Sequence, residues 1–277
     1  MLAALIIVFR EVFEAGLIVG IVLAVTRTVP HRNRWIGGGV LAGVLLACVV
    51  AVFAGALSNL FAGMGQELFN AAILIVAVVM LTWHNVWMAR HGKELAGELA
   101  AAGKAVVDGS KSLLALAIVV GVAVLREGSE VVLFLYGVVA TGSDTSWSVA
   151  FGGFVGLGLG VIVCLLTYFG LVRIPMRALF ATTTVLIALL AAGMAAQAAA
   201  FLEKANWLTA MDTVVWDSGW ILPDSSFLGR ALHTLIGYTD QPTAMQLTVY
   251  IAILLVTFVL MRLYGSPEKA KPAPAHS

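Results

Sequence analysis

Two short charged motifs stand inside long apolar stretches of this sequence. The first reads Arg-Glu-Val-Phe-Glu at residues 10–14, and the second reads Arg-Glu-Gly-Ser-Glu at residues 126–130. In each motif the glutamates are three residues apart and the arginine stands four before the second glutamate, so on a helix both carboxylates share a face and the arginine can pair. Because oxygen-rich carboxylate sites suit hard cations, the motifs predict a cation site. Its expected ligands are Glu11, Glu14, Glu127 and Glu130, with Arg10 and Arg126 balancing their charge.

The summed charge of the motifs also favours a cation. Four carboxylates and two guanidinium groups give −2 when all are ionised, so a divalent cation brings the cluster to zero and a trivalent one to +1. The absence of thiolates from the motifs, and a single histidine in the apolar segments, disfavour copper and zinc. The structural alternative is a pair of Arg–Glu contacts that hold helices together. That role would not need a second acid in each motif.

Three further polar residues are candidates for accessory metal binding or entry. Glu67 is either an entry ligand or an acid at the start of a helix. His84 is either a ligand or proton relay, or a side chain that hydrogen-bonds a neighbouring helix. Asp217 is either an acid at an outer mouth or a turn residue.

The elements that must position these residues are apolar segments long enough to cross a bilayer. Of the 277 residues, 61% are hydrophobic and 11% charged, against about 25% charged in a typical soluble domain. Runs of about 20 apolar residues are typical of transmembrane helices, and the first run has no basic leader, so we expect it to be retained. We count seven runs, at residues 2–26, 36–58, 68–88, 113–140, 147–171, 178–201 and 243–263.

This pattern predicts an all-α polytopic membrane protein with seven transmembrane helices. A single transmembrane domain covers residues 1–265, and the polar, proline-rich tail at 266–277 is expected to be disordered. The segment 202–242 is the longest external one, and its tryptophans suit a membrane interface.

Basic residues outside the apolar runs fall on alternate connections. Twelve lie on the connections after the first, third and fifth runs and on the tail, and only Lys204 and Arg230 lie on the other side. Positive charge is retained in the cytoplasm, so we predict that the N-terminus faces out and the C-terminus faces in. The outer side then carries seven acidic and two basic residues, a net charge of −5. Such a field attracts cations, although the topology rule alone also leaves acids outside.

The two motifs belong to an internal repeat with an offset of 116 residues. The same offset takes Cys48 to Cys164 and Gly37 to Gly153. Copying a unit of three helices reverses its direction in the membrane, so we predict two inverted repeats, at about 1–90 and 112–201, followed by a seventh helix. Transporters built this way place their sites near the midplane between the halves. Glycine-rich runs at 37–43 and 152–160 are expected to let helices pack closely.

At these residues the sequence resembles the oxidase-dependent iron transporter family, which includes fungal high-affinity and bacterial iron permeases. The family is marked by two Arg-Glu-x-x-Glu motifs, in its first and fourth helices. The motif at residues 126–130 is close to the common form, and the motif at residues 10–14 lacks the usual glycine but keeps every charge. The segments 66–69, 81–83 and 216–242 also look like the family's third helix and last external loop, so the likeness runs to about residue 263.

The resemblance implies a multi-pass permease of the inner membrane that takes up iron, as Fe(III) or Fe(II), through the motif glutamates. It implies no enzyme activity, no permanent cofactor and no nucleic acid, with iron as the transported substrate. Periplasmic iron-binding or iron-oxidising proteins would be its partners, beside membrane lipid. Glu67 is implied as an accessory site, and Asn70 stands where an acid is expected one turn later.

Two other functions stay open at this point. One is a permease for another divalent cation such as manganese or lead. The other is an intramembrane enzyme with a carboxylate-bound metal, although such sites usually pair Glu with Glu-x-x-His and neither motif has a histidine at that position.

Overall fold

Helices make up nearly all regular structure of the part of the chain that the computed structural model describes, residues 1–60, 66–141, 145–170 and 176–264. The predicted tail at 266–277, together with Asp144 and Arg173, lies outside these ranges. The described residues form eight helices: α1 (Leu2–Val25), α2 (Arg32–Leu60), α3 (Gln66–Val107), α4 (Leu113–Ala140), α5 (Ser146–Tyr168), α6 (Met176–Lys204), α7 (Phe227–Ile236) and α8 (Ala244–Tyr264).

Seven of these helices coincide with the seven apolar segments, but α3 is much longer than predicted. It has 42 residues and runs to Val107, so the prediction of a loop beginning after residue 88 is wrong for residues 89–107. This stretch is rich in Ala, Leu, Glu and Lys, which are strong helix formers, and it buries Leu99 and Val106. The eighth helix, α7, lies inside the external segment and begins where Ser226 Oγ accepts a hydrogen bond from the Gly229 amide.

Within the described residues, five helices contain stretches long and apolar enough to cross a membrane. The other two long helices, α1 and α4, each carry three charged motif residues in otherwise apolar sequence. The qualifying stretches are Arg32–Ala56, Gln66–Met88, Ser146–Tyr168, Ala181–Lys204 and Ala244–Tyr264.

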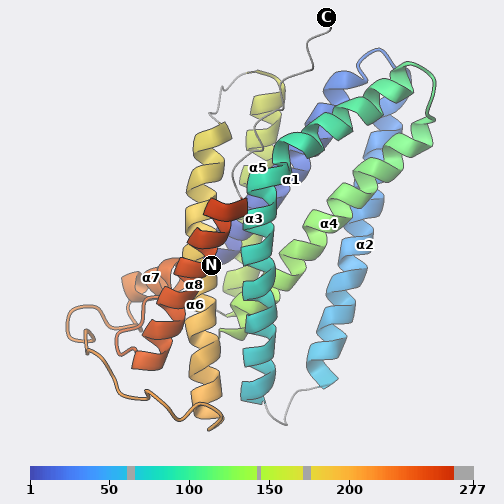
Figure 1. The fold of residues 1–277 in the computed structure, drawn as a ribbon. Coiled ribbons are helices and arrows are strands. Elements are labelled where there is room, and N and C mark those ends of the chain that lie inside the picture. Colours follow the sequence, from blue (N-terminus) through green and yellow to red (C-terminus); the bar gives the residue numbers. More distant parts are fainter. Residues whose placement is uncertain (61–65, 142–144, 171–175, 265–277) are drawn as a thin grey trace, which may run out of the picture.

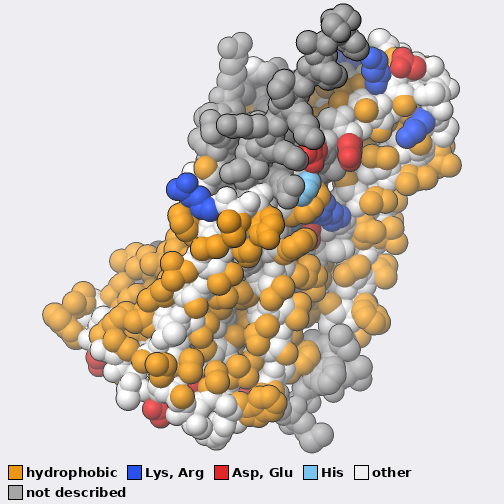
Figure 2. Space-filling model, in the orientation of Figure 1, with side chains coloured by type: hydrophobic (Ala, Val, Ile, Leu, Met, Phe, Trp, Pro, Cys, Tyr) orange, Lys and Arg blue, Asp and Glu red, His pale blue; other side chains and the backbone are white. Residues whose placement is uncertain are grey.

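The long helices run alternately up and down, with α1 and α4 crossing the bundle obliquely (Figure 1). The largest helix–helix contacts join α1 to α5 and α2 to α4, and α3 packs on α6. Hydrophobic side chains cover much of the outer surface (Figure 2); Phe154 and Val52, for example, are 77% and 73% exposed. An apolar surface of this extent is unsuited to water and fits contact with lipid.

Glycine sets the distance between the paired helices. A Cβ on Gly156 of α5 would lie 2.5 Å from the Leu5 carbonyl oxygen of α1, and one on Gly43 of α2 would lie 2.7 Å from the Gly121 carbonyl oxygen of α4. Both backbones therefore approach closely because no side chain stands between them. The predicted role of the glycine-rich runs is confirmed at these contacts, which hold the two motif-bearing helices in place.

Candidate metal centre

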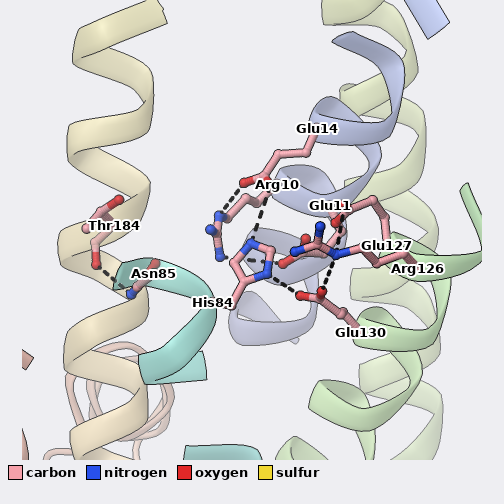
Figure 3. Close-up of polar contacts among 9 residues, drawn as sticks. All are labelled: Arg10, Glu11, Glu14, His84, Asn85, Arg126, Glu127, Glu130 and Thr184. Carbon is pink, nitrogen blue, oxygen red and sulfur yellow. Dashed lines mark hydrogen bonds and ion pairs between the residues drawn. The ribbon is translucent and has the colours of Figure 1, made fainter. Parts of the chain in front are cut away.

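The two charged motifs face one another at the centre of the bundle. The motif of α1 and the motif of α4 converge, and α3 adds a histidine between them (Figure 3). Six of the residues that meet here are at most 9% exposed: Arg10, Glu11, Glu14, His84, Glu127 and Glu130. Burying so many ionisable groups is costly unless each finds a partner, and in transmembrane segments such groups usually mark a transport pathway.

In the first motif the arginine holds both glutamates. Arg10 Nε lies 2.8 Å from Glu14 Oε1, one helical turn away, and Arg10 Nη1 lies 3.5 Å from Glu11 Oε1. The predicted pairing of the arginine with the second glutamate is confirmed. Because the Arg10 side chain is only 3% exposed, its charge is directed at the two carboxylates rather than at solvent.

The second motif repeats this pairing in a more open setting. Arg126 Nε lies 3.3 Å from Glu130 Oε1 and 4.0 Å from Glu127 Oε1. The Arg126 side chain is 38% exposed, and its guanidinium stacks 4.3 Å from the ring centre of Trp87. This cation–π contact helps to hold the exposed Arg126 side chain, whereas the buried Arg10 is held by its two carboxylates. The two arginines thus occupy equivalent positions in the motifs but differ in burial.

His84 joins the two motifs. Its Nε2 lies 3.3 Å from Glu14 Oε2 on α1, and its Nδ1 is in contact with Glu130 Oε2 on α4. The next residue, Asn85, is 1% exposed and donates from Nδ2 to the Thr184 carbonyl oxygen of α6 at 3.4 Å. This bond ties α3 to α6 beside the centre, so His84 is presented from a helix that is anchored on its far side (Figure 3).

One group of four side chains has the spacing of a metal site. Glu11, His84, Glu127 and Glu130 each offer one ligand atom, and these atoms all lie within 4.8 Å of one another. Ligand atoms lie about 2.0–2.6 Å from protein-bound metal ions, so two on opposite sides of an ion are about 4–5 Å apart. Three carboxylates and one imidazole can therefore reach a single cation here.

Three carboxylate oxygens of this group are buried without a hydrogen bond. Both oxygens of Glu11 and Oε2 of Glu127 accept none within the described part of the chain. Each of these carboxylates lies near one arginine, at 3.5 Å for Glu11 and 4.0 Å for Glu127, and each arginine also pairs with a second glutamate. Burying carboxylates whose charge is only partly balanced is costly, and a cation among them would supply further positive charge.

Comparison with known proteins decides the family. The model of the Iron permease FTR1 family matches residues 1–269 of the chain. This chain belongs to the Iron permease FTR1 family. The match confirms the resemblance seen in the sequence. With the apolar helices, it makes the chain a multi-pass permease of the inner membrane, in a family of iron transporters rather than enzymes.

Relatives of the same length carry the same description. The chain is 32% identical over 268 residues to "Ferrous iron permease EfeU" of Escherichia coli O6:H1, covering 94% of this chain and 96% of that protein. It is 30% identical over 267 residues to the protein of that name in Shigella sonnei (95% and 96% covered) and 30% identical over 264 residues to that of Yersinia pestis (94% and 93% covered). No solved structure matches the chain.

Two of the predicted entry residues lie away from the centre of this iron permease family member. Glu67 is exposed in the first turn of α3, 17 residues before His84 and so about 25 Å along the helix. Asp217 is exposed in the segment before α7, where Oδ1 accepts from the Gly219 amide and Oδ2 accepts from Gln241 Nε2, both at 2.9 Å. Its geometry is that of a turn residue, one of the two alternatives considered for it.

The part of the centre that sequence reasoning underestimated is His84. Burying an imidazole in a transmembrane segment costs free energy unless it has a partner. That cost is the feature of the local sequence that indicates carboxylate partners for His84. Its neighbour Asn85, also buried, was not singled out. Two consecutive buried polar residues in a transmembrane segment would have marked this turn of α3 as part of the centre.

Proposed function

We propose that this chain carries ferrous iron into the cytoplasm through the centre formed by its two Arg-Glu-x-x-Glu motifs. The observation that carries the proposal is the group Glu11, His84, Glu127 and Glu130, whose ligand atoms lie within 4.8 Å of one another in the core of an iron permease family member. The relatives' description as ferrous iron permeases supports Fe(II) as the cargo.

The charges of the centre fit a divalent cargo. Four glutamates and two arginines leave −2 when all are ionised, which one Fe(II) neutralises. Glu11, Glu127 and Glu130 would hold the ion directly, while Glu14 pairs with Arg10. The two arginines limit the net charge, so that binding is weak enough for release on the inner side.

The proposed architecture is seven transmembrane helices in two inverted repeats plus α8. Under the offset of 116 residues, α1 corresponds to α4 and α2 to α5. An exchange of the two repeats then turns the contact of α1 with α5 into the contact of α4 with α2, and these are the two largest contacts in the bundle. This reciprocity supports a pseudo-two-fold axis through the centre, where inverted-repeat transporters bind their substrates.

The proposed direction is from an acidic outer side to a basic inner side. The C-terminal ends of α1 and α3 lie at one end of the bundle (Figure 1). The basic residues Arg27, just after α1, and Lys104, in the last turn of α3, support a cytoplasmic position for that end by the positive-inside rule. Acidic residues of the opposite end, Glu67 and Asp217 among them, would raise the local cation concentration. A periplasmic iron-binding or iron-oxidising protein would deliver iron there.

Uptake of radioactive iron into vesicles that contain the purified protein tests the proposal. We expect uptake of Fe(II) kept reduced, slower uptake of Fe(III), and a loss of about tenfold or more in Glu11→Gln and in Glu127→Gln, since each removes a charged ligand. Glu98→Gln, an exposed glutamate on the far part of α3, is the matched control and should transport normally. Motif variants that take up iron at the wild-type rate would contradict the proposal, and uptake blocked preferentially by manganese or lead would reassign the cargo.

A further inference from the structure

We propose that His84 binds the transported cation through Nδ1 while its Nε2–H donates to Glu14, and that this nitrogen ligand makes the centre prefer ferrous iron to manganese and magnesium. The inference rests on the proposed transport of iron through the same centre. It assigns separate roles to Glu14 and Glu130, which occupy equivalent positions in the two motifs.

The two ring nitrogens of His84 face different carboxylates. Nδ1 contacts Glu130, which belongs to the group of four ligand atoms, whereas Nε2 lies 3.3 Å from Glu14, which does not. Nδ1 therefore points to the side where the cation would sit. The ring is 3% exposed, so water does not compete for either nitrogen.

The two ring nitrogens of His84 each face one carboxylate. Without a metal ion, an imidazolium with an N–H on both nitrogens suits this arrangement, and in the described residues neither nitrogen makes a hydrogen bond of suitable angle. A cation bound at Nδ1 would take the place of the Nδ1 proton, which leaves Nε2 with the single N–H, directed at Glu14 3.3 Å away. Metal-binding histidines usually donate their second ring N–H in this way to a carboxylate or carbonyl, which fixes the tautomer and the ring orientation.

This arrangement explains the place of Glu14. Three of the four motif glutamates contribute to the compact group, and Glu14 instead lies between Arg10 and His84, 2.8 Å from Arg10 Nε and 3.3 Å from His84 Nε2. Glu14 is thus a positioning residue that holds the imidazole. The equivalent glutamate of the other motif, Glu130, faces Nδ1 and the cation.

A nitrogen ligand changes which cations the centre prefers. Sites made only of oxygen suit magnesium and manganese, whereas imidazole suits iron and the later metals of the first transition row, and intrinsic affinity rises from Mn(II) to Fe(II). Replacing the imidazole by an amide oxygen should therefore weaken Fe(II) more than Mn(II).

The test has two measurements on the purified full-length protein. The first compares its affinities for Fe(II), Mn(II) and Mg(II), and the second is X-ray absorption at the iron edge, which identifies the ligands of bound iron. We expect His84→Gln to reduce the preference for Fe(II) over Mn(II) by about tenfold, and Glu14→Gln to weaken Fe(II) binding by about 10–100-fold while a nitrogen ligand is retained. His31→Gln is the control, because His31 is exposed in the connection between α1 and α2. It should leave both readouts unchanged.

The wild-type spectrum keeps the test decisive even where a variant does not fold. Imidazole scattering around bound iron is the expected result, and a wild-type iron shell of oxygen alone would overturn the inference. An unchanged Fe(II) preference in folded His84→Gln would also overturn it, although the transport of iron would still stand. A wild-type protein that neither binds nor transports Fe(II) would instead remove the proposed function.

Discussion

Glu11 and Glu127 are 116 residues apart in the chain, yet each offers a carboxylate oxygen to one group of four ligand atoms that lie within 4.8 Å of one another. They occupy equivalent places in the two motifs, on α1 and α4. Both are almost completely buried, at 1% and 3% exposure. Two like charges this close in the core of a membrane protein repel strongly, so their proximity is a feature that a cation would stabilise.

The first prediction concerns the contact that holds α1. Gly156→Ala should lower the free energy of unfolding by about 1–3 kcal/mol, because its Cβ would lie 2.5 Å from the Leu5 carbonyl oxygen and force α5 away from α1. Gly158→Ala is the control: nothing lies within 4 Å of its Cβ, so replacing a helical glycine should stabilise the protein by about 0.5–1 kcal/mol. Denaturant titration in detergent measures both. Equal effects of the two substitutions would show that this contact is unimportant.

The second prediction uses the unequal burial of the two arginines. Arg10→Met should destabilise the iron-free protein by about 3–5 kcal/mol, because it leaves two buried carboxylates without their cation. Arg126→Met should cost clearly less, since the Arg126 side chain is 38% exposed against 3% for Arg10. Thermal unfolding in the presence of a chelator compares the two variants. A larger loss for Arg126→Met would contradict the burial that the structure shows.

The third prediction is a pH dependence in the segment before α7. Burial, and then the neighbouring Asp240 carboxylate, raise the pKa of Asp224 above its ordinary value of 3.8. A raised folded-state pKa means that the folded protein binds this proton more tightly than the unfolded one, so stability falls as the pH rises from the ordinary value through the raised one. Asp224→Asn removes that loss and keeps the Oδ1 that accepts from the Asp240 amide at 3.2 Å.

The Tm of Asp224→Asn minus the Tm of the wild type should increase as the pH is raised from about 4 to about 7. Asp212→Asn, at an exposed acid of the same segment, should show no such gain. A constant difference between Asp224→Asn and the wild type across that range would argue against the raised pKa.

The apolar segments and the motifs were the parts of this protein that the sequence made predictable. Each long helix contains a predicted run of about 20 apolar residues. The spacing of Arg10 and Glu14 correctly predicted their pairing. Both are local properties: hydropathy identifies candidate transmembrane helices, and the helical period sets which side chains share a face.

What sequence reasoning left open depended on tertiary packing. His84 lies 70 residues from Glu14, and only the packing of α3 beside α1 and α4 brings the two side chains within 3.3 Å. The extension of α3 to Val107 was missed for a different reason. Hydropathy identifies the apolar part of α3 that suits lipid. Beyond it the helix continues in a sequence of strong helix formers that includes glutamate and lysine, so it has no continuous apolar run to mark it.

The central claim is that the two motifs form one site, and the number of Fe(II) ions bound per chain tests it most directly. Equilibrium dialysis of the purified protein under reducing conditions should give one Fe(II) per chain for the wild type and for Glu98→Gln. Glu11→Gln and Glu127→Gln should each lose that same ion, and the double variant should be no worse than either. Two ions per wild-type chain, with one retained in each single variant, would show two separate sites and contradict the account.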